Sequence, residues 1–151
     1  MINMRRPYIF RLEENKAIIR SLFEALNEQN LALLDELVAP DYVDHTIQIK
    51  GLEGLKRYIP MLPKAFPDLR ETIEDIIAEG DKVWIHFKVT GTHRGVYREL
   101  APTGKKFTIR AVSIYRIVDS KVVEREAIYD MLDYYKQLGV IEYKGFPDEV
   151  K

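Results

Sequence analysis

Cysteine is absent from this 151-residue chain. Its absence excludes disulfide bonds, thiolate nucleophiles and cysteine-ligated metal sites. The chain also lacks an excess of either charge, since 23 basic residues nearly balance 24 acidic residues and the formal net charge is -1. Without a basic stripe or an acidic tail, the sequence predicts no nucleic-acid partner.

Long apolar runs are lacking too, because none approaches the roughly 18 residues that cross a bilayer. Residues 1–10 include Arg5 and Arg6 but no apolar segment of the kind that a secretory signal requires. We therefore expect a cytoplasmic protein with no membrane partner. The length fits one domain with one core. We expect a loose arm or an extra edge strand at 1–11, a single domain at 12–140 and a tail at 141–151.

The hydrophobic period changes twice along the chain. Apolar residues recur at helical spacing in four segments: 12–29, 31–38, 51–66 and 131–138. Pro60 and Pro63 should bend the third of these helices, because proline lacks the backbone donor. From Leu69 to Asp130 the period is two, which predicts a four-strand meander. Helices followed by a meander predict an α+β domain, with the N-terminal helices packed on a strongly curved antiparallel sheet that encloses a pocket.

The last predicted hairpin turns at Asp119-Ser120. A two-residue turn pairs Val118 with Lys121 and so sets the faces of both strands. One face then mixes small, aromatic and acidic side chains, which suits a pocket: Ile109, Ala111, Ser113, Tyr115, Glu126, Ile128 and Asp130. The opposite face carries three arginines and is expected to lie outside: Arg110, Arg116 and Arg125. A bulge would shift the register by one residue and reverse this assignment.

Asp130 has two possible roles. A carboxyl in an apolar pocket has its charged form disfavoured, so it can act as a general acid or base near neutral pH. Asp130 also directly precedes the predicted helix at 131–138, and aspartate is a preferred N-cap residue. The sequence leaves both roles open. Glu126 is a candidate substrate contact, or else the partner of an arginine.

The other candidate site residues are histidines and aromatic side chains. His45 lies in a loop after Asp44 and is a candidate polar partner in proton transfer, while His93 lies where a strand turns into a loop. Each histidine could equally be a structural residue. Phe87 and Tyr58 are candidate pocket walls. The histidine spacings match no metal motif, so we expect no metal ion.

Several short motifs occur together in a characteristic order: Tyr42-Val43-Asp44-His45, Gly51-Leu52-Glu53-Gly54, Phe66-Pro67-Asp68, Glu79-Gly80-Asp81-Lys82-Val83, Gly91-Thr92-His93-Arg94-Gly95, Pro102-Thr103-Gly104, Tyr115-Arg116-Ile117, Lys121-Val122-Val123-Glu124, Asp130 and Gln137-Leu138-Gly139. With these motifs the chain resembles the SnoaL-like polyketide cyclase family, within the nuclear transport factor 2-like superfamily of cone-shaped α+β folds. The resemblance covers about residues 12–140. It implies a pocket between the helices and the sheet, and a homodimer formed through the sheet.

The resemblance also implies a chemistry. In characterised members, an acidic residue at the position of Asp130 is the general acid and base of an intramolecular aldol ring closure that uses no cofactor and no metal. At Glu126 and Ser120 the chain departs from the family's usual Trp and Gly. A carboxylate in place of the indole predicts a more polar pocket.

Three functional hypotheses follow. The first is a cyclase, isomerase or dehydratase that moves a proton on a small carbonyl substrate, with Asp130 as the acid and base. The second is a non-catalytic ligand-binding or dimerisation module, in which Asp130 only caps a helix. The third is a hydrolase, acting for example on an epoxide, with water activated between the carboxylates of Glu126 and Asp130.

Overall fold

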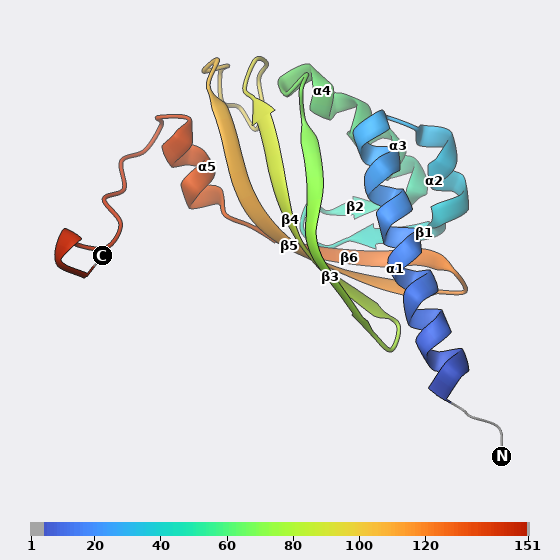
Figure 1. The fold of residues 1–151 in the computed structure, drawn as a ribbon. Coiled ribbons are helices and arrows are strands. Elements are labelled where there is room, and N and C mark those ends of the chain that lie inside the picture. Colours follow the sequence, from blue (N-terminus) through green and yellow to red (C-terminus); the bar gives the residue numbers. More distant parts are fainter. Residues whose placement is uncertain (1–4, 151) are drawn as a thin grey trace.

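A six-stranded sheet organises the molecule. The computed structural model describes residues 5–150. The strands are β1 (Val38–Asp44), β2 (Ile49–Lys50), β3 (Arg70–Glu79), β4 (Lys82–Thr92), β5 (Lys106–Val118) and β6 (Lys121–Tyr129), in the spatial order β2-β1-β6-β5-β4-β3. The expected meander is confirmed from β3 to β6, and β1 extends it by pairing parallel to β6. Figure 1 shows that this sheet is curled, and it does not close into a barrel.

The helices before β3 pack over the sheet (Figure 1). They are α1 (Arg5–Glu28), α2 (Leu31–Leu37), α3 (Leu52–Tyr58), the 3-10 turn η1 (Ile59–Met61) and α4 (Leu62–Ala65). The predicted bend of the third helix is confirmed, because the chain from Leu52 to Ala65 is broken near both prolines. The predicted first helix begins earlier than residue 12. Part of the expected arm is therefore helical from Arg5, and residues 1–4 lie outside the described residues.

The C-terminal segment follows the prediction closely. Helix α5 (Met131–Gln137) leaves the end of β6, and Gly139 follows it with a φ of 75°. A positive φ at this position is typical of a glycine that ends a helix. The remaining residues are exposed and include only the 3-10 turn η2 (Asp148–Val150).

The β5–β6 hairpin contains a bulge that changes the predicted faces. Asp119 and Ser120 both have positive φ, 51° and 62°, so the two-residue turn is confirmed. Ile117 then pairs with Val122, but Arg116 pairs with Glu124, which leaves Val123 as an extra residue. The bulge moves every later residue of β6 to the other face.

The predicted register beyond the bulge is therefore wrong. Tyr115 lies opposite Arg125, and Ser113 lies opposite Ala127. The inward face of β5 was assigned correctly, whereas β6 turns Arg125, Ala127 and Tyr129 inward. Glu126 and Ile128 point outward instead.

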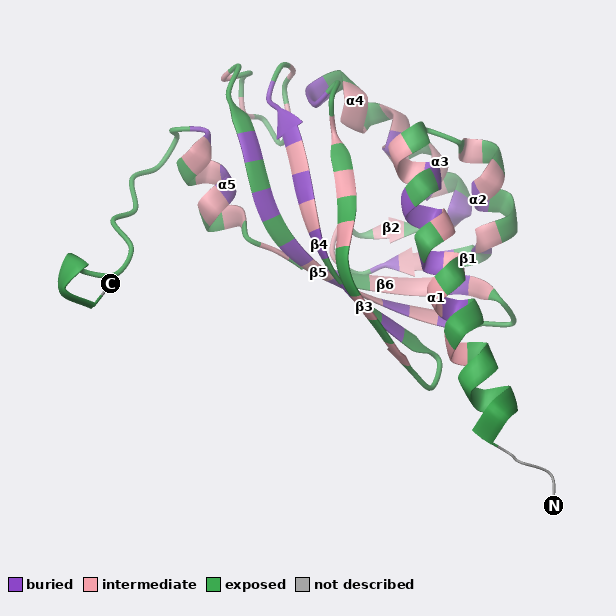
Figure 2. Ribbon diagram, viewed as in Figure 1, coloured by how far each residue is buried: buried purple, intermediate pink, exposed green. Residues whose placement is uncertain are grey.

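The core lies on the concave side of the sheet. Buried residues alternate with more exposed ones along β4 and β5, as Figure 2 shows. Phe23 of α1 packs edge-on against Phe87 and Tyr115, with ring centroids 5.2 and 6.5 Å apart. This aromatic cluster fixes α1 across the sheet and closes one side of the internal space.

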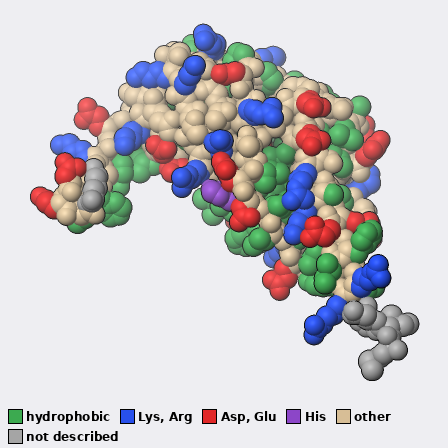
Figure 3. Space-filling model, in the orientation of Figure 1, with side chains coloured by type: hydrophobic (Ala, Val, Ile, Leu, Met, Phe, Trp, Pro, Cys, Tyr) green, Lys and Arg blue, Asp and Glu red, His purple; other side chains and the backbone are tan. Residues whose placement is uncertain are grey.

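The outer surface is of mixed charge. Basic and acidic side chains are interspersed on the face in Figure 3, in keeping with the balanced composition. None of the helices between residues 5 and 150 has the length and apolar character needed to cross a membrane.

An apolar patch interrupts this surface on the outer face of the sheet. Trp84 lies opposite Ile77 of β3 and Ile114 of β5, and Val112 of β5 lies opposite Ile128 of β6. Trp84 is 46 % exposed and Ile128 is 70 % exposed. Adjacent apolar side chains on one exposed face are typical of a protein–protein contact.

The homodimer that the resemblance implies stays a prediction, and this patch is where we expect it to form. Trp84→Lys should then convert the homodimer into a monomer, because it places a charge in an apolar contact. Sedimentation velocity at several protein concentrations measures this. Phe10→Lys, at an exposed position on α1, is the control. A monomeric wild-type protein, or a dimer that survives Trp84→Lys, would contradict the expectation.

Candidate active site

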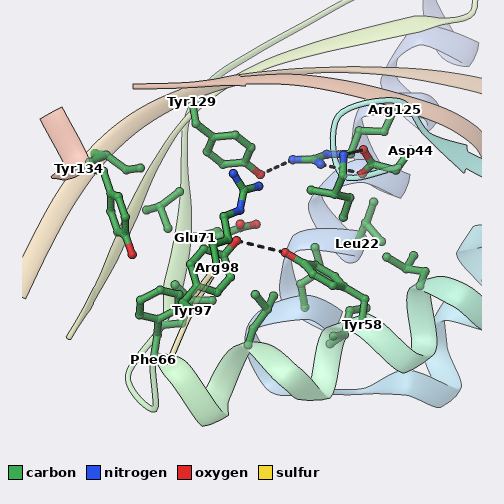
Figure 4. Close-up of a pocket in the computed structure, with 18 of the residues that line it drawn as sticks. Leu22, Asp44, Tyr58, Phe66, Glu71, Tyr97, Arg98, Arg125, Tyr129 and Tyr134 are labelled. Atoms are coloured by element: carbon green, nitrogen blue, oxygen red, sulfur yellow. Dashed lines mark hydrogen bonds and ion pairs between the residues drawn. The ribbon is translucent and has the colours of Figure 1, made fainter. Parts of the chain in front are cut away.

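A cavity lies between the helices and the concave side of the sheet. Its empty volume is about 1000 Å³, open mouth included. Most of the side chains around it are apolar or aromatic, with a few polar groups among them (Figure 4). That combination is typical of a small-molecule site, because apolar walls supply affinity and a few polar groups fix orientation.

A buried ion pair forms one wall of the cavity. Arg125 donates to Asp44, with Nη1 2.8 Å from Oδ2, and both side chains are almost fully buried. The hydroxyl of Tyr42 donates to the same carboxylate at 3.2 Å. The other oxygen of Asp44 accepts from the backbone N–H groups of Thr46 and Ile47, at 2.9 and 3.0 Å. Asp44 thus joins β6 to β1 and shapes the turn that follows β1.

Arg125 also orients two tyrosines. Its guanidinium donates to the hydroxyl oxygen of Tyr129 and lies 5.9 and 5.7 Å from the ring centres of Tyr115 and Tyr129. Burial raises the pKa of both tyrosines, although the charge of Arg125 opposes this shift. Tyr129 therefore remains a neutral hydroxyl. Because its oxygen already accepts from Arg125, its own hydrogen is free to be donated into the cavity.

Glu71, near the start of β3, brings a carboxyl into the same cavity. The side chain of Asn27 on α1 fixes its backbone through two hydrogen bonds of 2.8 Å, one to each backbone polar group. Burial raises the pKa of Glu71, and the positive charge of Arg125 opposes the rise. The Glu71 carboxyl makes no hydrogen bond or ion pair with the other residues of 5–150. It is therefore a candidate general acid or base.

Two tyrosines and an arginine lie at the mouth. The hydroxyls of Tyr58 and Tyr97 are 3.5 Å apart, and the guanidinium of Arg98 lies 5.5 Å from the Tyr97 ring centre. Burial raises the pKa of Tyr58, so its hydroxyl also stays neutral. Backbone hydrogen bonds between Tyr97 and Leu100 close a tight turn, with Arg98 at its tip.

Three of the residues predicted for the pocket, Tyr58, Ile109 and Tyr115, line this cavity. Asp130 is exposed, and its carboxylate accepts from the backbone N–H of Asp133 at 3.1 Å, so the predicted N-cap is confirmed. Asp130 is not among the lining residues. Its role as acid and base stays a prediction that this placement does not favour.

Glu126 and Ile128 are outside the pocket. Both are exposed on the convex face because of the bulge, so their predicted place in the pocket wall is wrong. A polar pocket at the position of the family's tryptophan does not result. The hydrolase hypothesis required Glu126 and Asp130 to share an internal water, and this geometry removes it.

The remaining candidates lie near the cavity or at the surface. Ser113 and Phe87 are fully buried but do not line it, although the Phe87 ring packs 6.0 Å from that of Tyr129. His93 is buried beside the loop after β4, with Nδ1 3.2 Å from the Thr103 hydroxyl. His45 is half exposed, and its Nε2 lies 2.8 Å from a Glu124 carboxylate oxygen. Neither histidine lines the cavity.

The other lining residues with polar groups were not among the predicted site residues: Tyr42, Asp44, Glu71, Tyr97, Arg98, Arg125, Tyr129 and Tyr134. One signal could have found part of this set. Arg125, Ala127 and Tyr129 share the period of a strand face, so a register that places Tyr129 inside also brings Arg125 inside. No comparable signal distinguishes Glu71 from the other polar residues of β3. Residues 5–150 contain no acidic or histidine cluster suited to a metal ion.

The buried ion pair predicts a large loss of stability on mutation. Asp44→Asn should lower the free energy of unfolding by about 3–5 kcal/mol, because it leaves the Arg125 charge buried without a counter-charge. Urea denaturation followed by circular dichroism measures this. Asp41→Asn, exposed on the same strand, is the control and should change stability by less than about 0.5 kcal/mol. Equal stability of the two variants would contradict a structural role for the pair.

The raised pKa of Glu71 predicts a pH-dependent gain of stability in Glu71→Gln. The folded state binds this proton more tightly than the unfolded state, whose glutamate pKa is about 4.3. Stability of the wild type therefore falls as pH rises from that value through the folded-state pKa. Glutamine does not titrate, so Glu71→Gln should be more stable than wild type at about pH 8 and nearly equal at about pH 4. Urea midpoints at both pH values test this, and a constant difference would contradict it.

Relatives with assigned functions are ring-closing enzymes of streptomycetes. The chain is 28 % identical over 129 residues to the aklanonic acid methyl ester cyclase DauD of Streptomyces sp. (strain C5), a match that covers 81 % of this chain and 80 % of DauD. It is 26 % identical to DnrD of Streptomyces peucetius, also an aklanonic acid methyl ester cyclase, and that match covers 81 % of this chain and 88 % of DnrD.

Several solved structures match the fold of this chain over most of its length. IdmH from Streptomyces antibioticus, a candidate polyketide cyclase, is 31 % identical with a TM-score of 0.72, and the match covers 83 % of this chain and 98 % of IdmH. AclR from Streptomyces galilaeus, for which a hydroxylase activity has been suggested, is 29 % identical with a TM-score of 0.76 and 92 % coverage of both chains. TsrD from Streptomyces laurentii shares the fold, with a TM-score of 0.79 at 24 % identity over 85 % of this chain and 97 % of TsrD.

The sequence model of the SnoaL-like polyketide cyclases matches residues 16–138. This match includes α2–α5, all six strands and most of α1, so it spans the cavity and its mouth. Membership supports a cyclase or isomerase function and leaves the reacting groups to be argued from the cavity itself. The chain belongs to the SnoaL-like polyketide cyclase family.

Proposed function

We propose that this protein is a cyclase or isomerase that moves a proton next to a carbonyl group of a small substrate bound in the cavity, without a cofactor. One observation carries the proposal. A carboxyl of raised pKa, Glu71, shares the cavity with a tyrosine hydroxyl, Tyr129, whose oxygen already accepts a hydrogen bond from Arg125. A base and a hydrogen-bond donor to an oxyanion are what enolate formation requires.

The first step is proton abstraction. The Glu71 carboxylate takes the proton from the carbon beside the carbonyl, and the electron pair of the C–H bond moves onto the carbonyl oxygen. The Tyr129 hydroxyl donates a hydrogen bond to that oxygen. Arg125 stabilises the developing negative charge through Tyr129, in a cavity where water is largely replaced by apolar side chains.

The second step returns the proton. In ring closure, the enolate carbon attacks a second carbonyl carbon of the same molecule, and protonated Glu71 gives its proton to the new alkoxide. In isomerisation, the proton returns to a different carbon. Both routes leave Glu71 ionised again and consume no other reactant. The cyclase activity of the relatives DauD and DnrD supports the first route for this chain.

The Glu71 carboxyl also lowers the stability of the folded protein. A glutamate at this position without a hydrogen-bond partner among the described residues reduces stability at neutral pH. A proton-transfer group benefits from the same environment, because a raised carboxyl pKa moves toward the working pH.

Proton exchange tests the proposal before the natural substrate is known. The probe is 2-tetralone in D₂O, and NMR measures deuterium incorporation beside its carbonyl. Glu71→Gln should lower the protein-catalysed exchange rate by about 10²–10⁴-fold. Tyr129→Phe should lower it as well, because the oxyanion loses its donor. Glu74→Gln, exposed on the same strand, is the control and should leave the rate unchanged.

Asp130→Asn separates the two candidate bases. Asparagine also caps helices well, so this variant should fold and keep nearly full exchange if Glu71 is the base. Loss of exchange in Asp130→Asn with full exchange in Glu71→Gln would assign the role to Asp130. A wild-type protein that binds the ketone without exchanging its proton would favour the non-catalytic binding module.

A further inference from the structure

The mouth of the cavity carries a positive charge that no carboxylate of the described chain neutralises, and we infer that it binds a carboxylate of the substrate. The charge belongs to Arg98, and the substrate would be an apolar keto acid. This inference rests on the proposed function, because it assigns the two ends of the molecule on which that chemistry acts.

The charges that line the cavity are unevenly distributed. Asp44 and Arg125 neutralise each other at 2.8 Å. Glu71 faces this pair, and burial disfavours its charged form. Arg98 is the other cationic lining residue, and it makes no ion pair with any residue of 5–150. Its neighbours are tyrosines, so the mouth has a net positive character and attracts an anion.

The backbone holds Arg98 in an unusual conformation. Arg98 and Glu99 both have positive φ, 48° and 65°, in the turn closed by the hydrogen bonds between Tyr97 and Leu100. Glycine would adopt this backbone without steric cost, whereas other residues are strained there. The chain nevertheless places an arginine at the tip. Figure 4 shows its guanidinium directed toward the space between Tyr58, Tyr97 and Tyr129 rather than away from the cavity.

The groups around Arg98 suit a carboxylate. A guanidinium offers two parallel N–H donors to the two oxygens of a carboxylate. The hydroxyls of Tyr58 and Tyr97 meet at 3.5 Å beside it. Burial keeps the pKa of Tyr58 high, so this hydroxyl can donate a hydrogen bond to an anion rather than repel it. A single cation with neutral donors matches a singly charged anion better than a phosphate dianion.

Most of the remaining cavity wall is apolar. Its aliphatic and aromatic side chains include Leu22, Leu26, Ile59, Leu62, Phe66 and Val89. A ligand with its carboxylate at Arg98 and its ketone at Tyr129 would therefore pack an apolar body against these walls. The methyl ester of the same molecule would lose the charge that Arg98 recognises.

Binding of a matched acid and ester tests the inference without turnover. The probes are 4-(2-naphthyl)-4-oxobutanoic acid and its methyl ester, and isothermal titration calorimetry measures both affinities. The wild type should bind the acid on the order of 10- to 100-fold more tightly than the ester. Arg98→Gln should remove this preference by weakening acid binding, and Arg98→Lys should restore part of it.

Two controls distinguish the subsite from general charge effects and from the proposed chemistry. Glu99→Gln, the neighbouring turn residue with positive φ, should keep the acid preference. Glu71→Gln should also keep it, although it loses proton exchange. If Glu71→Gln keeps exchange while the acid preference still depends on Arg98, the chemistry fails and the subsite stands.

Three outcomes would overturn the inference. The first is equal affinity for acid and ester, or no detectable binding of the acid. The second is an acid preference that Arg98→Gln leaves intact. The third is tighter binding of 2-naphthyl phosphate than of the acid, which would assign the mouth to phosphate. In each case, exchange of 2-tetralone that depends on Glu71 would leave the proposed function standing.

Discussion

The buried pair of Asp44 and Arg125 is the interaction on which the site depends. It connects β1 to β6 across the parallel edge of the sheet, where the ladder is irregular. The remaining hydrogen bonds of Asp44 hold the turn after β1, and those of Arg125 hold Tyr129. A buried ion pair rarely adds net stability over apolar packing. Its value here is geometric, because it fixes a tyrosine hydroxyl and a cationic field at one place in the cavity.

The bulge at Val123 determines that Arg125 can take part in this pair. Turn chemistry at Asp119-Ser120 is local, so the sequence predicts the turn and its first residue pair correctly. A bulge depends on the curl of the whole sheet, and Val122 and Val123 are equally suitable strand residues. The helix periods and the bend at the prolines were predictable for the same local reason. The faces of β6 required the tertiary structure.

The site was less predictable than the fold because its key residues are charged. Charged side chains are mostly exposed, so a sequence pattern favours the surface for Glu71, Asp44 and Arg125. Packing of β3 against α1 brings Glu71 inside, and the two hydrogen bonds of Asn27 fix its backbone there. Tyr58 and Tyr115 were found because aromatic residues on a buried face are a recognisable pattern. Asp130 is the converse case, since its cap function was visible in the sequence.

The features that reduce the stability of the molecule lie around one cavity. An uncompensated carboxyl lies at Glu71, and a strained turn at Arg98 lies at the opening. Departures from local consistency are expected where function requires them, because elsewhere they only reduce stability. Glu71 is acidic and Arg98 is cationic, so the two features also differ in the sign of their charge. A base with an oxyanion donor and a separate unpaired cation give the cavity two distinct polar groups, so a substrate that carries both a ketone and a carboxylate would bind productively in one orientation.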